Sequence, residues 1–107
     1  IHLDLKGAGI RAMCYDTVKE GFFIISGTSG DEKQPSLLWF WESWRSEHPV
    51  PVTIAGVDEL GNAEGITPVR LHDGDKGLLI VNDDGSKAKK RAAGYLFVPY
   101  KNLSIGN

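Results

Sequence analysis

The fold of this chain is decided by two similar stretches, GIRAMCYDTVKEGFFIISGTSG at residues 9–30 and GITPVRLHDGDKGLLIVNDDGS at residues 65–86. They align without a gap, so that one constant offset carries every position of the first onto the second. Apolar runs stay in register, and matching positions extend beyond the two stretches: Gly9 with Gly65, Gly21 with Gly77, and Trp39 with Tyr95. Because chance matches rarely keep glycines and apolar runs aligned without insertions, the pattern predicts an internal duplication.

Each repeat has the pattern of β-strands. The apolar runs are short, rich in β-branched and aromatic residues, and bounded by Gly, Pro, Asp or Asn. The expected strands are Ile10–Tyr15, Phe22–Ser26, Leu37–Glu42 and Val50–Ala55 in the first repeat, and Ile66–Leu71, Leu78–Asn82 and Gly94–Val98 in the second. The sequence ends about where a fourth strand of the second repeat would begin. The alternating segment IHLDL at residues 1–5 is one candidate for that strand.

Four-stranded antiparallel units that recur every 40–50 residues are typical of β-propeller blades. We therefore expect an all-β fold with one domain over residues 1–107, composed of two consecutive four-stranded antiparallel propeller-type blades. The repeats cover about residues 7–56 and 63–107. Two blades cannot close a ring, so the chain would be a fragment of a larger β-propeller or would associate with other copies. The alternative is a small β-sandwich or barrel built from the same strands.

The composition narrows the class of protein. The 107 residues, with 41% hydrophobic and 24% charged side chains, suit one globular domain. A net charge of −2 gives no basic surface for nucleic acid, and no apolar stretch is long enough to span a membrane. We expect a soluble protein, with the compartment open between cytoplasm and periplasm. Because the chain begins at Ile1 rather than at methionine, we also expect a processed product or a piece of a longer protein.

Oxygen-bearing side chains collect around one end of the second repeat. Asn62 and Glu64 lead into its first strand, and Asp83 and Asp84 follow its second. In a propeller blade these positions share a rim, and carboxylate and amide oxygens are the ligands that Ca²⁺ prefers. The sequence therefore predicts a candidate metal site formed by these four residues. The competing interpretations are an ordinary turn for the two aspartates and, for Glu64, hydrogen bonds to backbone amides or an ion pair with Arg11.

The alignment bears on this site. At the offset that matches Gly9 with Gly65, Glu64 aligns with Ala8 and Asp83 with Gly27. The acids are then absent from the first repeat, which favours a role beyond the fold. The segment HDGDKG at residues 72–77 resembles the start of a calcium loop, but we interpret it as a hairpin turn.

Arg11 and Lys87 are the candidate residues for binding an anion or a substrate. A guanidinium near the rim can hold a phosphate or carboxylate through two hydrogen bonds, and Lys87 lies in the basic segment SKAKKRA. The alternatives are an arginine that locks one repeat to the next and a solvated loop. Strand alternation places Trp39 and Trp41 on one side of their strand and Phe40 on the other. Exposed tryptophans there would indicate a partner surface.

Several motifs resemble an uncharacterised bacterial propeller-like family that has a Gly-Ile-Arg strand followed by an Asn-x-Glu-Gly strand. They are GIRAMCYD, GFFIISG, LLWFW, and NAEGIT followed by LLIVNDDG, and together they span about residues 7–98. The family is distantly similar to the esterase-like phytase propellers. The resemblance implies a propeller fold and a position in the C-terminal part of a longer protein, and it carries no settled activity.

The leading functional hypothesis is a binding or interaction module, or a C-terminal piece of a larger propeller. It would associate with itself or with the remainder of its parent, without enzymatic activity of this chain alone. The alternative is a Ca²⁺-assisted phosphoesterase of the phytase-like kind. In that case Glu64, Asp83 and Asp84 hold the cation, and Arg11 assists with a small anionic substrate. A sugar-binding surface at Trp39 and Trp41 ranks third.

Overall fold

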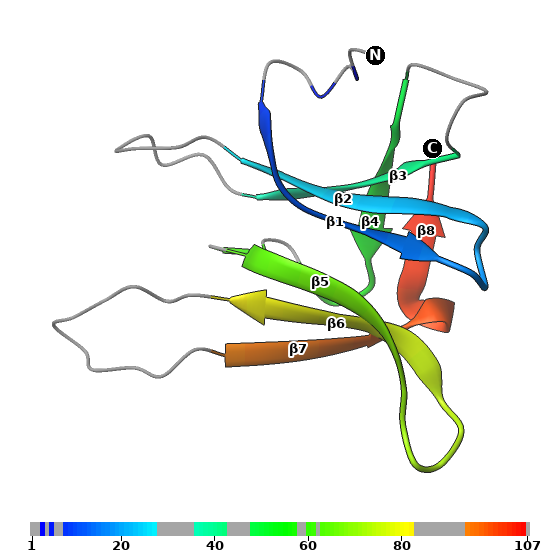
Figure 1. Cartoon of the computed structure of the whole chain (residues 1–107). Coiled ribbons are helices and arrows are strands. Elements are labelled where there is room, and N and C mark those ends of the chain that lie inside the picture. Colours follow the sequence, from blue (N-terminus) through cyan, green and yellow to red (C-terminus); the bar gives the residue numbers. More distant parts are fainter. Residues whose placement is uncertain are drawn as a thin grey trace, which may run out of the picture.

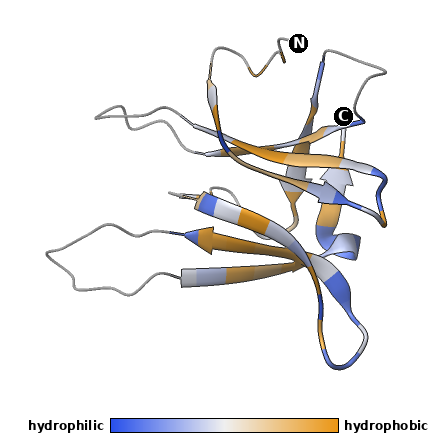
Figure 2. Cartoon of the chain, in the orientation of Figure 1, coloured by the Kyte–Doolittle hydropathy of each residue, from blue (hydrophilic) through white to orange (hydrophobic). Residues whose placement is uncertain are grey.

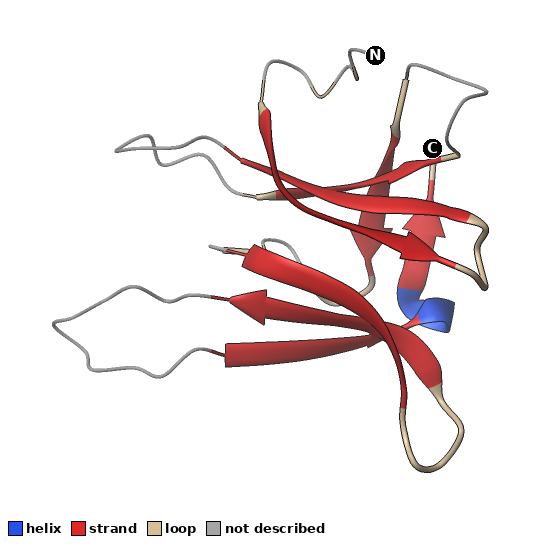
Figure 3. Cartoon of the chain, viewed as in Figure 1, coloured by secondary structure: helices blue, strands red, loops and turns tan. Residues whose placement is uncertain are grey.

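The structure is a computed structural model, and it describes residues 3, 5, 8–27, 36–42, 48–57, 60–61, 63–82 and 94–106. This part of the chain is all-β apart from one short 3₁₀ helix (Figure 3). The elements are β1 (Gly9–Asp16), β2 (Gly21–Gly27), β3 (Leu37–Trp41), β4 (Val50–Ile54), β5 (Ala63–Arg70), β6 (Lys76–Asn82), β7 (Gly94–Pro99), η2 (Tyr100–Asn102) and β8 (Leu103–Ile105). The prediction of an all-β fold is confirmed. Within these ranges, no helix has the length and hydrophobicity required to cross a membrane.

The strands form two antiparallel sheets that pack face to face. Sheet A has the order β1-β2-β3-β4-β8, and sheet B has the order β5-β6-β7. Strands β1 and β5 lie side by side where the two sheets meet (Figure 1). Such a pair of layers is compatible with a small β-sandwich.

The expectation of two equal four-stranded units is wrong in its strand count. In the described part, sheet B has three strands and sheet A has five, because β8 pairs with β4 instead of β7. After Pro99 the chain turns through η2, and Leu103 then packs against the core beside Ile54. The N-terminal segment also departs from its expected place, since Leu3 and Leu5 pack on sheet A, against Ile24 and Trp39.

Neighbouring strands approach closely at equivalent points of the two sheets. Gly21 and Gly77 stand at equivalent points, near the start of β2 and β6. A Cβ atom on Gly21 would lie 2.9 Å from the carbonyl oxygen of Trp41, and one on Gly77 would collide with the backbone of Val98 and Pro99. Any larger residue would push the next strand away in both repeats. The offset that the alignment gives therefore holds for these two strands.

The constant offset is wrong for the other strands. Asp16 pairs with Gly21, whereas Val69 pairs with Gly77, so Asp16 corresponds to Val69 in the first strands. Four residues separate the first pair and seven separate the second, so the second hairpin is three residues longer. In the third strands Trp41 corresponds to Val98, one position beyond the aligned residue, because Phe22 pairs with Trp41 and Leu78 pairs with Val98.

The main core lies between the sheets. Sheet A contributes Phe23, Ile25, Leu38, Phe40, Val52 and Ile54, sheet B contributes Ala63, Ile66, Leu78, Ile80 and Val98, and Leu60 joins them from the connection. The rings of Phe23 and Phe40 lie 5.0 Å apart, and neither side chain is more than 6% exposed. This contact between two layers is the principal source of stability.

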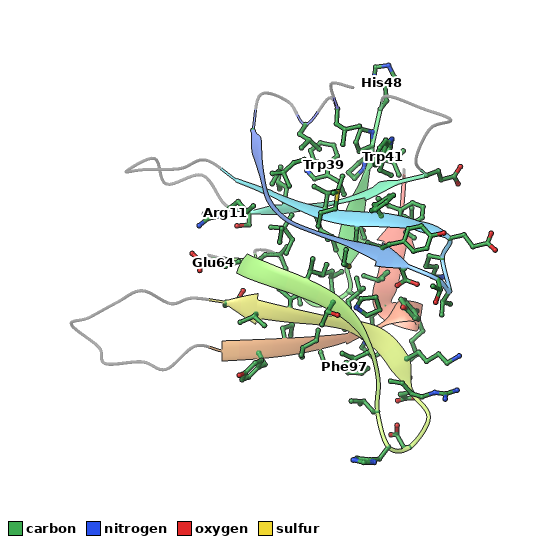
Figure 4. The ribbon with its side chains drawn as sticks, in the orientation of Figure 1. Arg11, Trp39, Trp41, His48, Glu64 and Phe97 are labelled. Carbon is green, nitrogen blue, oxygen red and sulfur yellow. The ribbon has the colours of Figure 1, made fainter. Side chains whose placement is uncertain are left out.

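The faces that point away from this core are apolar as well. Strands β2 and β6 are hydrophobic at successive positions rather than alternate ones (Figure 2). On the outer face of sheet A, Trp39 donates a hydrogen bond of 2.8 Å from Nε1 to Oγ of Ser26. Trp39 and Trp41 lie on this face and Phe40 lies in the core, so the predicted alternation is confirmed (Figure 4). Strands that are apolar on both sides are typical of sheets covered on both sides.

Candidate functional site

Arg11 and Glu64 occupy the same position in the two repeats. The ladder between β1 and β2 shifts register between Ile10 and Ala12, so Arg11 is the extra residue of a β-bulge. The ladder between β5 and β6 shifts between Ala63 and Gly65, and there the extra residue is Glu64. Bulges at the ends of paired strands redirect a side chain toward the sheet edge. The alignment of Glu64 with Ala8 is therefore wrong. The first repeat has no acid at this position, as the sequence indicated, but it has Arg11 there.

The two bulge residues form an ion pair between the sheets. Nη2 of Arg11 donates a hydrogen bond to Oε1 of Glu64 over 3.1 Å. The arginine side chain is 29% exposed and that of the glutamate is 46% exposed. Both project from the same edge of the molecule (Figure 4). This contact supports the interpretation of Glu64 as the partner of Arg11. The same contact occupies the guanidinium that was a candidate for binding an anion.

The shared edge predicted for the second repeat is present in the described residues. Ala63 pairs with Asn82, so the end of β6 lies beside the bulge at Glu64. The side-chain oxygen of Asn82 is buried and has no hydrogen-bond partner among the described residues. Asn62, Asp83, Asp84 and Lys87, which complete the predicted metal and anion sites, lie outside the described residues. The described residues contain no group of three or more His, Cys, Asp or Glu side chains that could hold a metal ion.

A second polar cluster, which the sequence did not predict, lies at the other end of β1. Asp16 is fully buried, and its Oδ1 accepts hydrogen bonds from the backbone amides of Val18 at 2.8 Å and Lys19 at 3.0 Å. Its Oδ2 accepts a hydrogen bond from the hydroxyl of Tyr100, which comes from η2. The ammonium of Lys19 lies 5.4 Å from the centre of the Tyr100 ring. Asp16 thus closes its own hairpin and attaches the connection between β7 and β8 to sheet A.

Burial and the Asp16 carboxylate keep the neighbouring groups protonated. Desolvation, and then the negative charge of Asp16, raise the pKa of Cys14 to about 11. Burial and the hydrogen bond to Asp16 raise the pKa of Tyr100 above its ordinary value. A thiol held protonated is a poor nucleophile. The contacts of this cluster connect the first hairpin with η2.

A small pocket lies between the last strands of sheet A and the connection to sheet B. Its volume is about 140 Å³, and it is lined by Ser36, Leu37, Leu38, Val52, Thr53, Ile54, Val57 and Leu60. No titratable side chain is among them. Pockets that bury a small-molecule ligand usually have volumes of roughly 300–1,000 Å³. The pocket is therefore smaller than a typical ligand pocket, and its lining residues include no titratable group.

The segment HDGDKG is a hairpin turn, as predicted. Leu71 donates a backbone hydrogen bond of 2.7 Å to the carbonyl of Asp75, and Oδ1 of Asp73 accepts one of 2.9 Å from the Asp75 amide. Gly74 adopts a φ of 93°, which favours glycine. These contacts close the loop between β5 and β6.

Comparison of the chain with protein-family models, with curated proteins and with solved structures found no match. The resemblance to the propeller-like family stays a prediction.

Proposed function

We propose that this chain is an interaction module whose two sheets are consecutive units of a propeller-type stack. Its outer faces would act as binding surfaces that neighbouring β-sheets cover. The observation that carries the proposal is the apolar character of both faces of both sheets. A two-layer sandwich needs only one apolar face in each sheet, with polar residues outside.

The outer faces hold large hydrophobic side chains that the chain itself leaves accessible. On sheet A, the exposed fractions are 47% for Met13 and 49% for Tyr15, and Tyr15 stacks edge-on with Phe22 at 5.1 Å. The row continues to Trp41, whose ring centre lies 5.4 Å from that of Phe22. On sheet B, Tyr95 is 73% exposed, and Phe97 lies on the side away from sheet A (Figure 4). Contiguous apolar patches of this kind mark protein interaction sites.

The experiment substitutes exposed apolar residues of the outer faces by lysine. Met13→Lys and Tyr95→Lys should each change the free energy of unfolding by about 0.5 kcal/mol or less, because neither side chain belongs to the core. The same changes should reduce the fluorescence of a bound hydrophobic dye. Denaturant unfolding and dye titration, both at low protein concentration, measure the two effects.

Ile80→Ala provides the control, because Ile80 is fully buried between the sheets. It should cost about 2–5 kcal/mol. If Met13→Lys or Tyr95→Lys were as destabilising as this control, the outer faces would be parts of the core, and the proposal would fail.

The alternative of a Ca²⁺-assisted phosphoesterase has no comparable support among the described residues. Glu64, its central ligand, pairs with Arg11 instead. Titration calorimetry with CaCl₂ checks this directly. Equal heats for the native chain and for Glu64→Gln would leave the ion pair as the role of Glu64, whereas binding abolished by the substitution would restore the metal hypothesis.

A further inference from the structure

The geometry points to a specific partner: we propose that the outer face of sheet B binds the outer face of sheet A of a second copy of this chain, head to tail. This inference rests on the proposed function and deepens it by naming the occupant of the surface. It follows from the correspondence between the interface inside the chain and the faces outside it.

The outer face of sheet B is the counterpart of the inner face of sheet A. With the correspondence that the strand pairings give, Phe23 matches Leu79, and Phe40 matches Phe97. Phe23 and Phe40 are buried against sheet B. Leu79 and Phe97 alternate along their strands with core residues, so they lie on the face of sheet B that points away from sheet A. The outer face of sheet B therefore has side chains like those of the inner face of sheet A, which is the face that packs against sheet B.

The outer face of sheet A is likewise the counterpart of the inner face of sheet B. Phe22 corresponds to Leu78, and Met13 corresponds to Ile66. Leu78 and Ile66 form the side of the core that meets sheet A. Around Met13 and Phe22, the outer face of sheet A therefore has apolar side chains at the positions whose counterparts in sheet B meet sheet A inside the chain, whereas Leu3 and Leu5 cover the part of this face at Ile24 and Trp39.

The closest part of the internal interface is the contact of β1 with β5 (Figure 1). There, the small side chains of Ala12 and Cys14 allow the two strands to approach. Their counterparts on the outer face of β5 are Gly65 and Thr67, which are also small. In a second copy, Met13 and Tyr15 would meet these positions. Beside them, Leu5 of the same chain already covers Ile24, the cross-strand neighbour of Met13, and Trp39.

Charge along the edge supports the same register. Arg11 and Glu64 stand at equivalent bulges, so a head-to-tail stack would place the Glu64 of one copy beside the Arg11 of the next. Opposite charges would alternate along the edge of such a stack. Such complementarity fixes orientation and register between partners.

The test uses two variants, each with one blocked face. Met13→Lys with Tyr15→Lys blocks sheet A, and Thr67→Lys with Tyr95→Lys blocks sheet B. All four positions are exposed, so both variants should fold. Burying lysine in an apolar contact should weaken self-association at least about tenfold, corresponding to 1.4 kcal/mol. Sedimentation velocity of each variant, of the native chain and of an equimolar mixture measures the assemblies.

The expected result is that the native chain associates, that each blocked variant is monomeric, and that the mixture forms a one-to-one heterodimer through the two intact faces. Val18→Lys and Leu71→Lys are matched controls, because both replace exposed apolar residues in hairpin loops and should leave association unchanged.

A monomeric native chain, or a mixture that stays monomeric, would overturn the second copy as the partner. Association by one blocked variant alone would overturn the head-to-tail arrangement in favour of like faces. Each of these results would leave the proposed function standing if Met13→Lys and Tyr95→Lys still lose dye binding without losing stability. If these two variants were instead as destabilising as Ile80→Ala, both proposals would be overturned.

Discussion

The two ends of the β1 strand are tied to the rest of the molecule in opposite ways. At its start, the Arg11–Glu64 ion pair lies at the surface, with 46% of the glutamate side chain exposed. At its end, Asp16 is fully buried and accepts three hydrogen bonds, one of them from Tyr100. Water competes more strongly with the ion pair than with the part-buried hydrogen bonds of Asp16. We therefore expect the end at Asp16 to contribute more to stability than the exposed end.

The largest effect should come from Asp16→Ala. The substitution removes the acceptor of two backbone amides and of the Tyr100 hydroxyl, all in part-buried hydrogen bonds. Because each such hydrogen bond contributes about 1 kcal/mol, we expect a loss of about 3 kcal/mol in the free energy of unfolding. Denaturant unfolding followed by tryptophan fluorescence measures it.

Asp73→Ala is the matched control for this substitution. Asp73 closes the corresponding hairpin of sheet B with a single hydrogen bond at the surface. Its loss should cost about 1 kcal/mol or less. Equal costs for the two aspartates would mean that the burial of Asp16 does not strengthen its contribution to stability.

Tyr100→Phe should have the next largest effect. It keeps the ring beside Lys19 but removes the donor to Oδ2 of Asp16. We expect a loss of about 1–3 kcal/mol, because a buried carboxylate oxygen loses its partner. Tyr15→Phe is the control, since Tyr15 is 49% exposed and should be nearly neutral. A neutral Tyr100→Phe would show that the two backbone amides alone hold Asp16 in place.

Alkaline pH should weaken the buried end selectively. Burial raises the pKa of Cys14 from 9.0 to about 11, and burial also raises the pKa of Tyr100 from its ordinary 10.0. The unfolded chain therefore releases these protons first. The contribution of the Cys14 thiol to the free energy of unfolding is complete below pH 9 and declines as the pH rises from 9 to 11. The contribution of the Tyr100 phenol declines above pH 10. Unfolding measured from pH 7 to 11 should show this decline, and Cys14→Ala should remove its first part.

The sequence predicted those features that local patterns determine. Apolar runs such as FFIIS located β2, and the glycines at residues 21 and 77 marked positions where neighbouring strands approach closely. The pairing of Arg11 with Glu64 was also among the interpretations. Features that depend on distant parts of the chain were missed. The three-residue strand β8 carries too weak a pattern to reveal its pairing with β4, and no spacing rule connects Asp16 with Tyr100, which is 84 residues away.

The unequal hairpins explain the error in the alignment. A gapless alignment treats both repeats as equally long, but the hairpin of sheet B contains three more residues than that of sheet A. The shift concealed the equivalence of Arg11 and Glu64 and associated the glutamate with Ala8 instead. The charged residues at both bulges, Arg11 and Glu64, join sheet A to sheet B. The constant offset could not reveal this role because it did not align the two residues.

The smallest effect should come from the exposed end. Arg11→Ala and Glu64→Ala should each lower the free energy of unfolding by about 1 kcal/mol or less, because surface ion pairs contribute roughly 0.2–1 kcal/mol. The double-mutant cycle isolates their coupling, and 1 M salt should reduce it, since the Debye length falls to about 3 Å. A coupling well above 1 kcal/mol that persists in salt would show that the Arg11–Glu64 pair stabilises the fold, as the hydrogen bonds of Asp16 do at the other end of β1. A small, screened coupling together with weakened self-association would mean that the pair acts mainly between copies.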